Sequence, residues 1–422
     1  MRVYRAALVA LFVLAPLAFA DVTVKDVREM AKGGSNALPK LQEVLKDPDP
    51  EVRVEAVKQI TAIGTLASLD PLILATQDNE PEVQIRATDG LVNFYLPGYV
   101  QTGFASSLKR VGSTIKGKFT DTNDQVVDPY IMVRPEVITA LGKLARGGGD
   151  MEARANAARA VGILRGKAAV PDLLAAIHTK DSDVIYESLT ALQKIRDESA
   201  APSISFLLHD FNPKVQVAAI ETTGLLQNKQ EVPDLTDVLN RARNASVRRA
   251  ALTAIAMLPV ASSRQLYERY LTDKDDKMRA AAAEGFARLH DPQDLPNVEK
   301  AWMDEGKTPP RLALAFAQVM LGKTEISEFS PLTYLINSLN STSWEGVAFA
   351  YLVELAREAP IRTALYAPLD SGTKDEKIHI ARILARSGDK DSVDHLQKLS
   401  TDPDSEVAQE ATRALRSLKA RL

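Results

Sequence analysis

The sequence predicts an all-α protein, a right-handed solenoid of about eleven helical hairpins interrupted by one irregular insertion. A short pattern returns along the chain with a period of about 31 residues: an Asp or Asn, an apolar residue three positions later, and a small residue four positions after that. The apolar positions of this pattern are Val52, Val83, Ala153, Val184, Val215, Val247, Met278 and Val407, with weaker ones at Leu312, Val347 and Ile378. Such a period is typical of stacked units that bury their apolar faces against their neighbours.

The pattern marks the second helix of each unit. Its opening residues are suited to cap a helix, because a side-chain oxygen there accepts an unpaired backbone N–H of the first turn. The predicted caps are Asp49, Asp150, Asp181, Asn212, Asn244, Asp275, Asp375 and Asp404. The small residues that follow would let neighbouring helices approach closely; they are Ala56, Ala87, Ala157, Ser188, Ala219, Ala251, Ala282 and Ala411. Proline follows the cap position at Pro50, Pro81 and Pro213, where its missing N–H costs little.

An earlier helix completes each unit. It opens near a proline and runs through stretches such as "PDLLAAI" (171–177) and "PSISFLL" (202–208). Two antiparallel helices within one period make a hairpin that is stable only when it is stacked on others.

These units resemble HEAT repeats, in particular the short HEAT-like units of phycobilisome lyase-type proteins. The stretch "LPKLQEVLKDPDPEVRVEAV" (38–57) carries the resemblance most clearly, including Asp49 and Arg53. It extends over residues 35–95 and 133–422 and is looser between about 290 and 374. The resemblance implies a solenoid that serves as a protein-binding scaffold. It also implies that Arg53, Arg154, Arg248 and Arg279, one position past the apolar anchors, form a ladder with carboxylates of neighbouring turns.

Residues 96–132 interrupt the repeat, because more than twice the usual period separates the anchor Val83 from the next anchor, Ala153. Phe104, Leu108, Val111, Ile115 and Phe119 fall at helical spacing and predict an amphipathic helix, although Gly112 and Gly117 weaken it. A hairpin turning at "DTND" (121–124) is the alternative.

The same segment contains "GSTIKGKFT" (112–120), which resembles a phosphate-binding loop. Such a loop needs a preceding buried strand and a hydroxyl residue after its lysine. Here Phe119 follows Lys118 and an amphipathic helix precedes the stretch, so we do not expect nucleotide binding.

Two functions are open for the insertion. Its apolar stripe could simply pack on the solenoid while the basic residues face water, or it could dock a protein partner or a membrane surface. The candidate partner-binding residues are Tyr99, Phe104, Lys109, Arg110, Lys116, Lys118 and Phe119.

The N-terminus predicts export. Arg2 and Arg5 precede an apolar run from Ala6 to Leu17, and Ala18-Phe19-Ala20 is typical of a signal-peptide cleavage site. Residues 1–20 are therefore predicted to be a signal peptide cleaved near Ala20, and residues 21–95 to hold an N-terminal cap and the first repeats. An exported protein of this kind would be periplasmic or secreted, and the absence of cysteine means that no disulfide stabilises it.

Chemistry-bearing residues are sparse. The five histidines include His178 and His209, which lie one repeat period apart at the ends of first helices and are interpreted as capping or solvated groups. The carboxylate runs at 47–51 and 273–277 recur at helix starts, which favours caps over a metal site. We therefore expect no cofactor and no metal, and with a formal charge of −3 no nucleic-acid partner.

The function predicted from the sequence is an exported, non-enzymatic scaffold that binds a protein partner through its concave face and residues 96–132. An envelope-associated structural protein that contacts lipid through the insertion is one alternative. A HEAT-fold enzyme such as a lyase is another.

Overall fold

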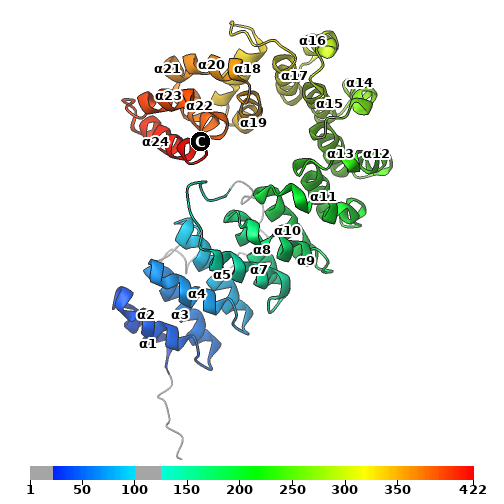
Figure 1. Ribbon diagram of the computed structural model, residues 1–422. Coiled ribbons are helices and arrows are strands. Elements are labelled where there is room, and N and C mark those ends of the chain that lie inside the picture. Colours follow the sequence, from blue (N-terminus) through cyan, green and yellow to red (C-terminus); the bar gives the residue numbers. More distant parts are fainter. Residues whose placement is uncertain (1–21, 101–124) are drawn as a thin grey trace, which may run out of the picture.

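The computed structural model describes residues 22–100 and 125–422, and every regular element in these two ranges is helical. The helices form two rows that follow one curve, so that the C-terminal end turns back toward the segment that follows residue 125 (Figure 1). Within the described chain there are eleven hairpins, each giving one helix to each row, which confirms the predicted solenoid. The predicted signal peptide and most of the insertion, with its predicted amphipathic helix, lie outside the described residues.

The inner row contains the second helix of each hairpin. Its members are α3 (Pro50–Ile63), α5 (Pro81–Tyr95), α8 (Met151–Ile163), α10 (Ser182–Ile195), α11 (Pro213–Leu225), α13 (Ala245–Met257), α15 (Asp276–Leu289), α17 (Thr308–Met320), α19 (Glu345–Leu355), α22 (Lys374–Ser387) and α24 (Ser405–Lys419). Each of them contacts the next, and α1 (Val24–Ala31) packs on α3 before the first hairpin.

The outer row contains the first helices. They are α2 (Leu38–Val44), α4 (Leu69–Ala75), α7 (Pro135–Gly147), α9 (Val170–Ala176), η5 (Glu198–His209), α12 (Val232–Arg241), α14 (Arg264–Tyr270), α16 (Leu295–Asp304), α18 (Pro331–Asn337), α20 (Ala359–Ala364) with α21 (Tyr366–Ser371), and α23 (Asp391–Leu399). Short 3₁₀ turns accompany them: η1 (Gly34–Ala37), η2 (Leu66–Ser68), η4 (Lys167–Ala169), η6 (Lys229–Glu231), η7 (Ala261–Ser263), η8 (Pro292–Asp294) and η9 (Ser338–Asn340).

One outer element differs from the α-helix expected there. The segment η5 is a 3₁₀ helix along its whole length. Pro202 lies inside it, and a proline in a helix interior removes a backbone donor and clashes with the preceding turn. The tighter 3₁₀ winding, in which each residue bonds three positions back, is the conformation that this segment adopts.

The inner row is held together by a seam of small residues. All eight predicted small positions, from Ala56 to Ala411, are completely buried. At Gly162 the neighbouring helix comes closer still, because a Cβ atom there would lie 2.7 Å from the Cα atom of Ala191 on α10. The seam therefore sets how closely consecutive hairpins approach.

The helix caps follow the sequence with one exception. Asp49, Asp150, Asp181, Asn212, Asn244, Asp275 and Asp404 each accept a backbone N–H of the first turn, as predicted. The prediction for Asp375 is wrong, because α22 begins earlier than the pattern indicates and is capped by Thr373. Thr373 and Glu376 form a reciprocal capping box that satisfies two backbone donors, and Asp375 lies within the first turn.

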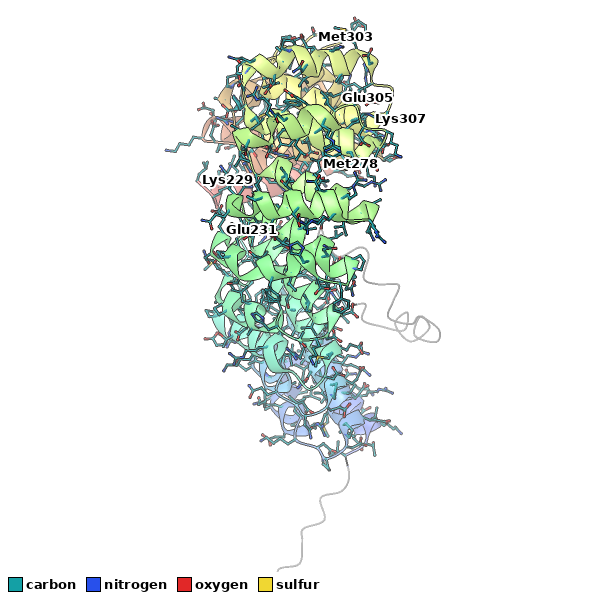
Figure 2. All side chains as sticks on the ribbon, turned by 90° about the vertical axis from the view of Figure 1, so that its right-hand side faces the viewer. Lys229, Glu231, Met278, Met303, Glu305 and Lys307 are labelled. Atoms are coloured by element: carbon teal, nitrogen blue, oxygen red, sulfur yellow. The ribbon has the colours of Figure 1, made fainter. Side chains whose placement is uncertain are left out.

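The predicted arginine ladder is formed in part. Arg53 binds Asp78 at 2.8 Å, and Arg279 binds Glu305 at 2.7 Å. Figure 2 labels Glu305 in the turn before α17, with Met278 beside it on the preceding unit. Arg154 instead donates to the carbonyl of Ala145, and Arg248 forms no ion pair with residues 22–100 or 125–422. Other inner-row arginines complete similar bridges, such as Arg159 with Glu187 at 3.1 Å.

We predict that Thr373→Ala lowers the free energy of unfolding by about 1 kcal/mol, because it removes the cap of α22. The matched variant Asp375→Ala, which leaves the capping box intact, is expected to have a smaller effect. Urea denaturation of both variants measures the difference. Equal losses would contradict the assignment of the cap.

We predict that Ala251→Leu lowers the free energy of unfolding by about 1–3 kcal/mol, because the seam between α11, α13 and α15 has no room for a larger side chain. Ala245→Leu, in the exposed first turn of the same helix, is the control and should change stability little. The same urea measurement applies. A tolerated Ala251→Leu would show that the seam does not limit packing.

Candidate functional site: a basic cavity between the middle and the C-terminal end of the solenoid

A cavity of about 750 Å³ lies where the C-terminal hairpins return to the middle of the chain. Three parts of the chain wall it: residues 126–129, the C-terminal ends of α8, α10 and α11, and the helices α22 and α24. Its cationic lining residues are Arg165, Lys194, Arg196, Arg382, Arg386, Arg413 and Arg421. Asp128 and Glu410 are the two carboxylates that line it. The cavity therefore carries an excess of positive charge.

The segment 126–129 links the third hairpin to the C-terminal end of the solenoid. The backbone N–H of Val127 donates to the carbonyl of Ile163 at the end of α8 (3.0 Å), and the Val127 side chain is buried. Asp128, the next residue, binds Arg413 of α24 at 3.0 Å. These contacts join the last hairpin to the third.

The ion pair alone is too weak to hold this closure. Arg413 keeps 57% of its side chain exposed, and pairs of this kind contribute less than about 1 kcal/mol. The burial of Val127 and the backbone hydrogen bond to Ile163 fix the position of Asp128 beside α8, and the ion pair then joins Asp128 to α24.

Helix geometry positions two of the arginines. Arg165 and Arg196 lie just after the ends of α8 and α10, at equivalent positions of neighbouring hairpins, and both have left-handed backbones with φ of 51° and 60°. Such a conformation commonly ends a helix, and a cation there is favoured by the partial negative charge of the last turn. The repeat therefore places both guanidinium groups along the same edge of the inner row, where its helices end.

The charge on this side of the cavity is not balanced. Arg382 binds Glu410 at 2.9 Å, and Arg421 donates to the backbone carbonyl of Gly388. Neither Arg165 nor Arg196 has an ion-pair partner within the part of the chain that the structure describes. Loss of surrounding water, and then the nearby positive charges of Arg165 and Arg357, lower the pKa of Arg196, although its side chain remains exposed at the cavity wall.

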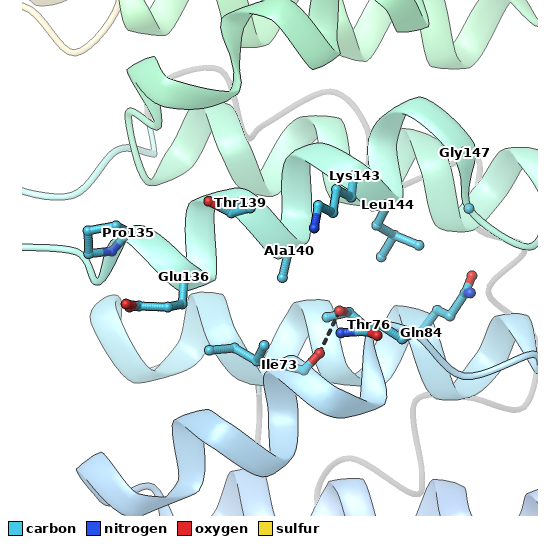
Figure 3. Close-up of a pocket in the computed structure, with 12 residues that line it drawn as sticks. Ile73, Thr76, Gln84, Pro135, Glu136, Thr139, Ala140, Lys143, Leu144 and Gly147 are labelled. Atoms are coloured by element: carbon cyan, nitrogen blue, oxygen red, sulfur yellow. Dashed lines mark hydrogen bonds between the residues drawn. The ribbon is translucent and has the colours of Figure 1, made fainter.

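A second hollow lies in the outer row, where the insertion separates two hairpins. A groove of about 460 Å³ runs between α4 and α7 and is lined by residues that include Ile73, Thr76, Ala140 and Leu144 (Figure 3). The Thr76 hydroxyl donates to the carbonyl of Ile73 within α4 (2.7 Å) and is not available to a ligand as a donor. The groove offers a mixed surface for contact with another molecule.

The stacking of hairpins continues across the insertion. Arg134, just before α7, binds Asp70 of α4 at 2.8 Å, and its backbone N–H donates to the Tyr95 hydroxyl at 3.1 Å. The insertion is therefore an addition to the solenoid, since the hairpins on either side of it pack as neighbours.

Tyr99 is the one predicted partner-binding residue that lies within the described chain. It is half-buried and packs against the core, and burial raises the pKa of its hydroxyl to about 12. Asp89 and the Arg159–Glu187 pair lie close enough to influence it electrostatically. The other candidates, Phe104, Lys109, Arg110, Lys116, Lys118 and Phe119, lie outside the described residues, so their role stays a prediction.

The histidines have local structural contacts. His209 lies 2.8 Å from Asp234, and His178 stacks on Phe206 with ring centroids 4.9 Å apart. Over residues 22–100 and 125–422 the His, Asp and Glu side chains form no group suited to hold a metal ion. Within the same ranges the helices are too short or too polar to cross a bilayer.

The family assignment follows from comparison with known proteins. The family model for HEAT repeats matches residues 20–101, 138–222, 202–284 and 232–317, which together exceed half of the chain. The chain therefore belongs to the HEAT-repeat family. A search of curated protein sequences gives no match.

Several solved structures are similar to this chain at low sequence identity. An engineered protein is 19% identical, with 90% of this chain and 98% of that chain covered and a TM-score of 0.38. The CpcE–CpcF complex of phycocyanin lyase from Nostoc is 16% identical, with 76% and 95% covered and a TM-score of 0.32. Importin beta is 14% identical, with 95% and 59% covered and a TM-score of 0.40.

The sequence did not single out the basic cavity. The sequence does show that Arg165 and Arg196 occupy equivalent positions of neighbouring repeats, because they follow the anchors Ala153 and Val184 at the same spacing. Their proximity to Arg413 and Arg421 depends on the curvature of the whole solenoid, which the repeat period does not specify.

We predict that the closure depends on the sign of the charges at positions 128 and 413. Asp128→Arg or Arg413→Asp places like charges together and should open the contact, whereas the double swap should restore it. The chain has no native cysteine, so spin labels at Met132→Cys and Lys419→Cys, both exposed, report the distance between the third hairpin and the last. Identical distance distributions in all four backgrounds would show that this pair does not guide the closure.

We predict that Asp89→Asn removes a pH dependence of stability. Burial raises the pKa of Asp89 in the folded protein above its ordinary value of 3.8, so the folded state binds the proton more tightly than the unfolded state. The free energy of unfolding should therefore fall as the pH rises from about 4 through the folded pKa. The asparagine keeps an oxygen to accept the hydrogen bond from Asn156 and should lack this fall. Urea denaturation across this pH range measures the free energy of unfolding of both proteins. The same dependence of this free energy on pH in wild type and Asp89→Asn would contradict the prediction.

Proposed function

We propose that this HEAT-repeat protein is an exported, non-enzymatic scaffold that binds a protein partner. The observation that carries the proposal is the continuous inner row of eleven helices, each in contact with the next. Stacked repeats of this kind create extended concave surfaces, which contact a partner over many units. Membership of the HEAT-repeat family supports the same function.

The proposed partner contact includes residues 96–132. The hairpins on either side of this segment stack directly, so the insertion is not needed to continue the repeat. Its sequence is rich in aromatic residues, which are enriched at protein interfaces. The groove between α4 and α7 is lined by Pro135, where the chain returns from the insertion to the solenoid, and adds to the available surface (Figure 3).

Replacement of residues 101–124 by a Gly-Ser segment of equal length tests this contact. The replacement keeps residues 126–129, which form the closure contact, and should leave thermal unfolding unchanged. Proteins that cross-link to the tagged wild type in its native compartment, as identified by mass spectrometry, should be lost from the variant. A replacement that unfolds the protein would show instead that the insertion is part of the core. Retention of every cross-linked partner would place the contact elsewhere.

Export is tested separately. The mature protein should begin near Asp21 and be recovered from the periplasmic or secreted fraction, because residues 1–20 have the pattern of a cleaved signal peptide. Cell fractionation followed by N-terminal sequencing identifies the compartment and the first residue of the protein. An intact Met1 in the cytoplasmic fraction would contradict export. Sedimentation with liposomes that requires residues 101–124 would favour the alternative of a membrane-contacting envelope protein.

A further inference from the structure

The basic cavity holds more positive charge than its own carboxylates neutralise. Asp128 and Glu410 are engaged by Arg413 and Arg382. Three further lining arginines have no carboxylate partner among the described residues, and we call them the arginine cluster: Arg165, Arg196 and Arg421. Like charges that gather in a partly enclosed space repel one another, and a bound anion relieves that repulsion.

The arginine cluster comes from the middle and the C-terminal end of the solenoid. Arg165 and Arg196 follow α8 and α10, whereas Arg421 follows α24. An anion in the cavity would contact guanidinium groups of both regions at once. Its binding would therefore be linked to the closure that Asp128 and Arg413 form.

The side chains that line the cavity indicate the chemical class of its ligand. Six of the seven cationic lining residues are arginines, whose planar guanidinium groups donate paired hydrogen bonds to phosphate or carboxylate oxygens. The volume of about 750 Å³ is in the range of small-molecule sites. A phosphate group brings up to about two charges and three acceptor oxygens in a compact unit. A carboxylate carries only one negative charge, so an acidic peptide would need a longer groove to bring the same total charge to the arginines.

We propose that the cavity lined by Arg165, Arg196 and Arg421 is a binding site for a small soluble polyanion that carries clustered phosphate groups. The ligand bridges the middle and the C-terminal end of the solenoid. Residues 126–129 of the insertion form one wall of this cavity, but none of the three arginines lies in the insertion, so variants of the arginines test this proposal separately from the protein partner.

Isothermal titration of the full mature chain with inorganic tripolyphosphate tests the proposal. Wild type should bind it more tightly than sulfate at matched ionic strength. Arg165→Gln/Arg196→Gln and, separately, Arg421→Gln should weaken binding by about tenfold or more, since each removes charge-assisted hydrogen bonds. Arg241→Gln, which removes an exposed arginine from the outer helix α12, is the matched control and should bind as wild type does. Thermal melting should show ligand stabilisation in wild type and Arg241→Gln but not in the cluster variants.

Several results would overturn the proposal. If Arg241→Gln weakens the binding of tripolyphosphate as much as the cluster variants do, binding reflects general charge attraction. If tripolyphosphate binds no more tightly than sulfate, the cavity is not a specific site for clustered phosphate groups. An oligoglutamate peptide that binds more tightly than tripolyphosphate would assign the cavity to an acidic protein segment. Vesicles of anionic phospholipid that outcompete tripolyphosphate would place the phosphate groups on a membrane. The cross-linking test of the protein partner is unaffected by these outcomes, so the two proposals fail separately.

Discussion

The close approach of successive inner-row helices is the contact on which the rest of the structure depends. Small, fully buried residues form this seam from Ala56 to Ala411, and at Gly162 even a methyl group would meet the backbone of the next helix. Each hairpin buries its apolar face against its two neighbours, and stability grows by one interface with each unit. The angle between neighbours, set at the seam, accumulates into the curve of the whole molecule.

That curve gives the chain a contact that a straight array could not make. The last hairpin reaches residues 126–129, which are fixed to the end of α8 by the Val127–Ile163 hydrogen bond. The Asp128–Arg413 pair at this contact is weak by itself, because Arg413 remains well exposed. A closure of this kind is sensitive to charge, to ionic strength and to any ligand that bridges it.

The two proposed activities of the protein come from different parts of this architecture. The insertion and the inner face offer area and aromatic residues, which suit a protein partner. The cavity offers concentrated positive charge in a small volume, which suits a small anion. Because the cavity joins the middle of the solenoid to its C-terminal end, an anion bound there would fix the curvature of the inner face between them, which meets the partner.

The sequence by itself determined the features that depend on neighbouring residues: the number of hairpins, the small-residue seam and the caps. Even the failure at Asp375 is local, since Thr373 and Glu376 form a capping box that the repeat pattern had hidden. The hydrogen bond from Arg154 to the Ala145 carbonyl was not predicted, because it depends on the turn that the arginine side chain faces. Only the tertiary structure brought Arg165 and Arg196 to Arg413 and Arg421. A repeat period specifies which residues meet between neighbours, whereas the meeting of distant repeats depends on the sum of many small rotations that no single repeat encodes.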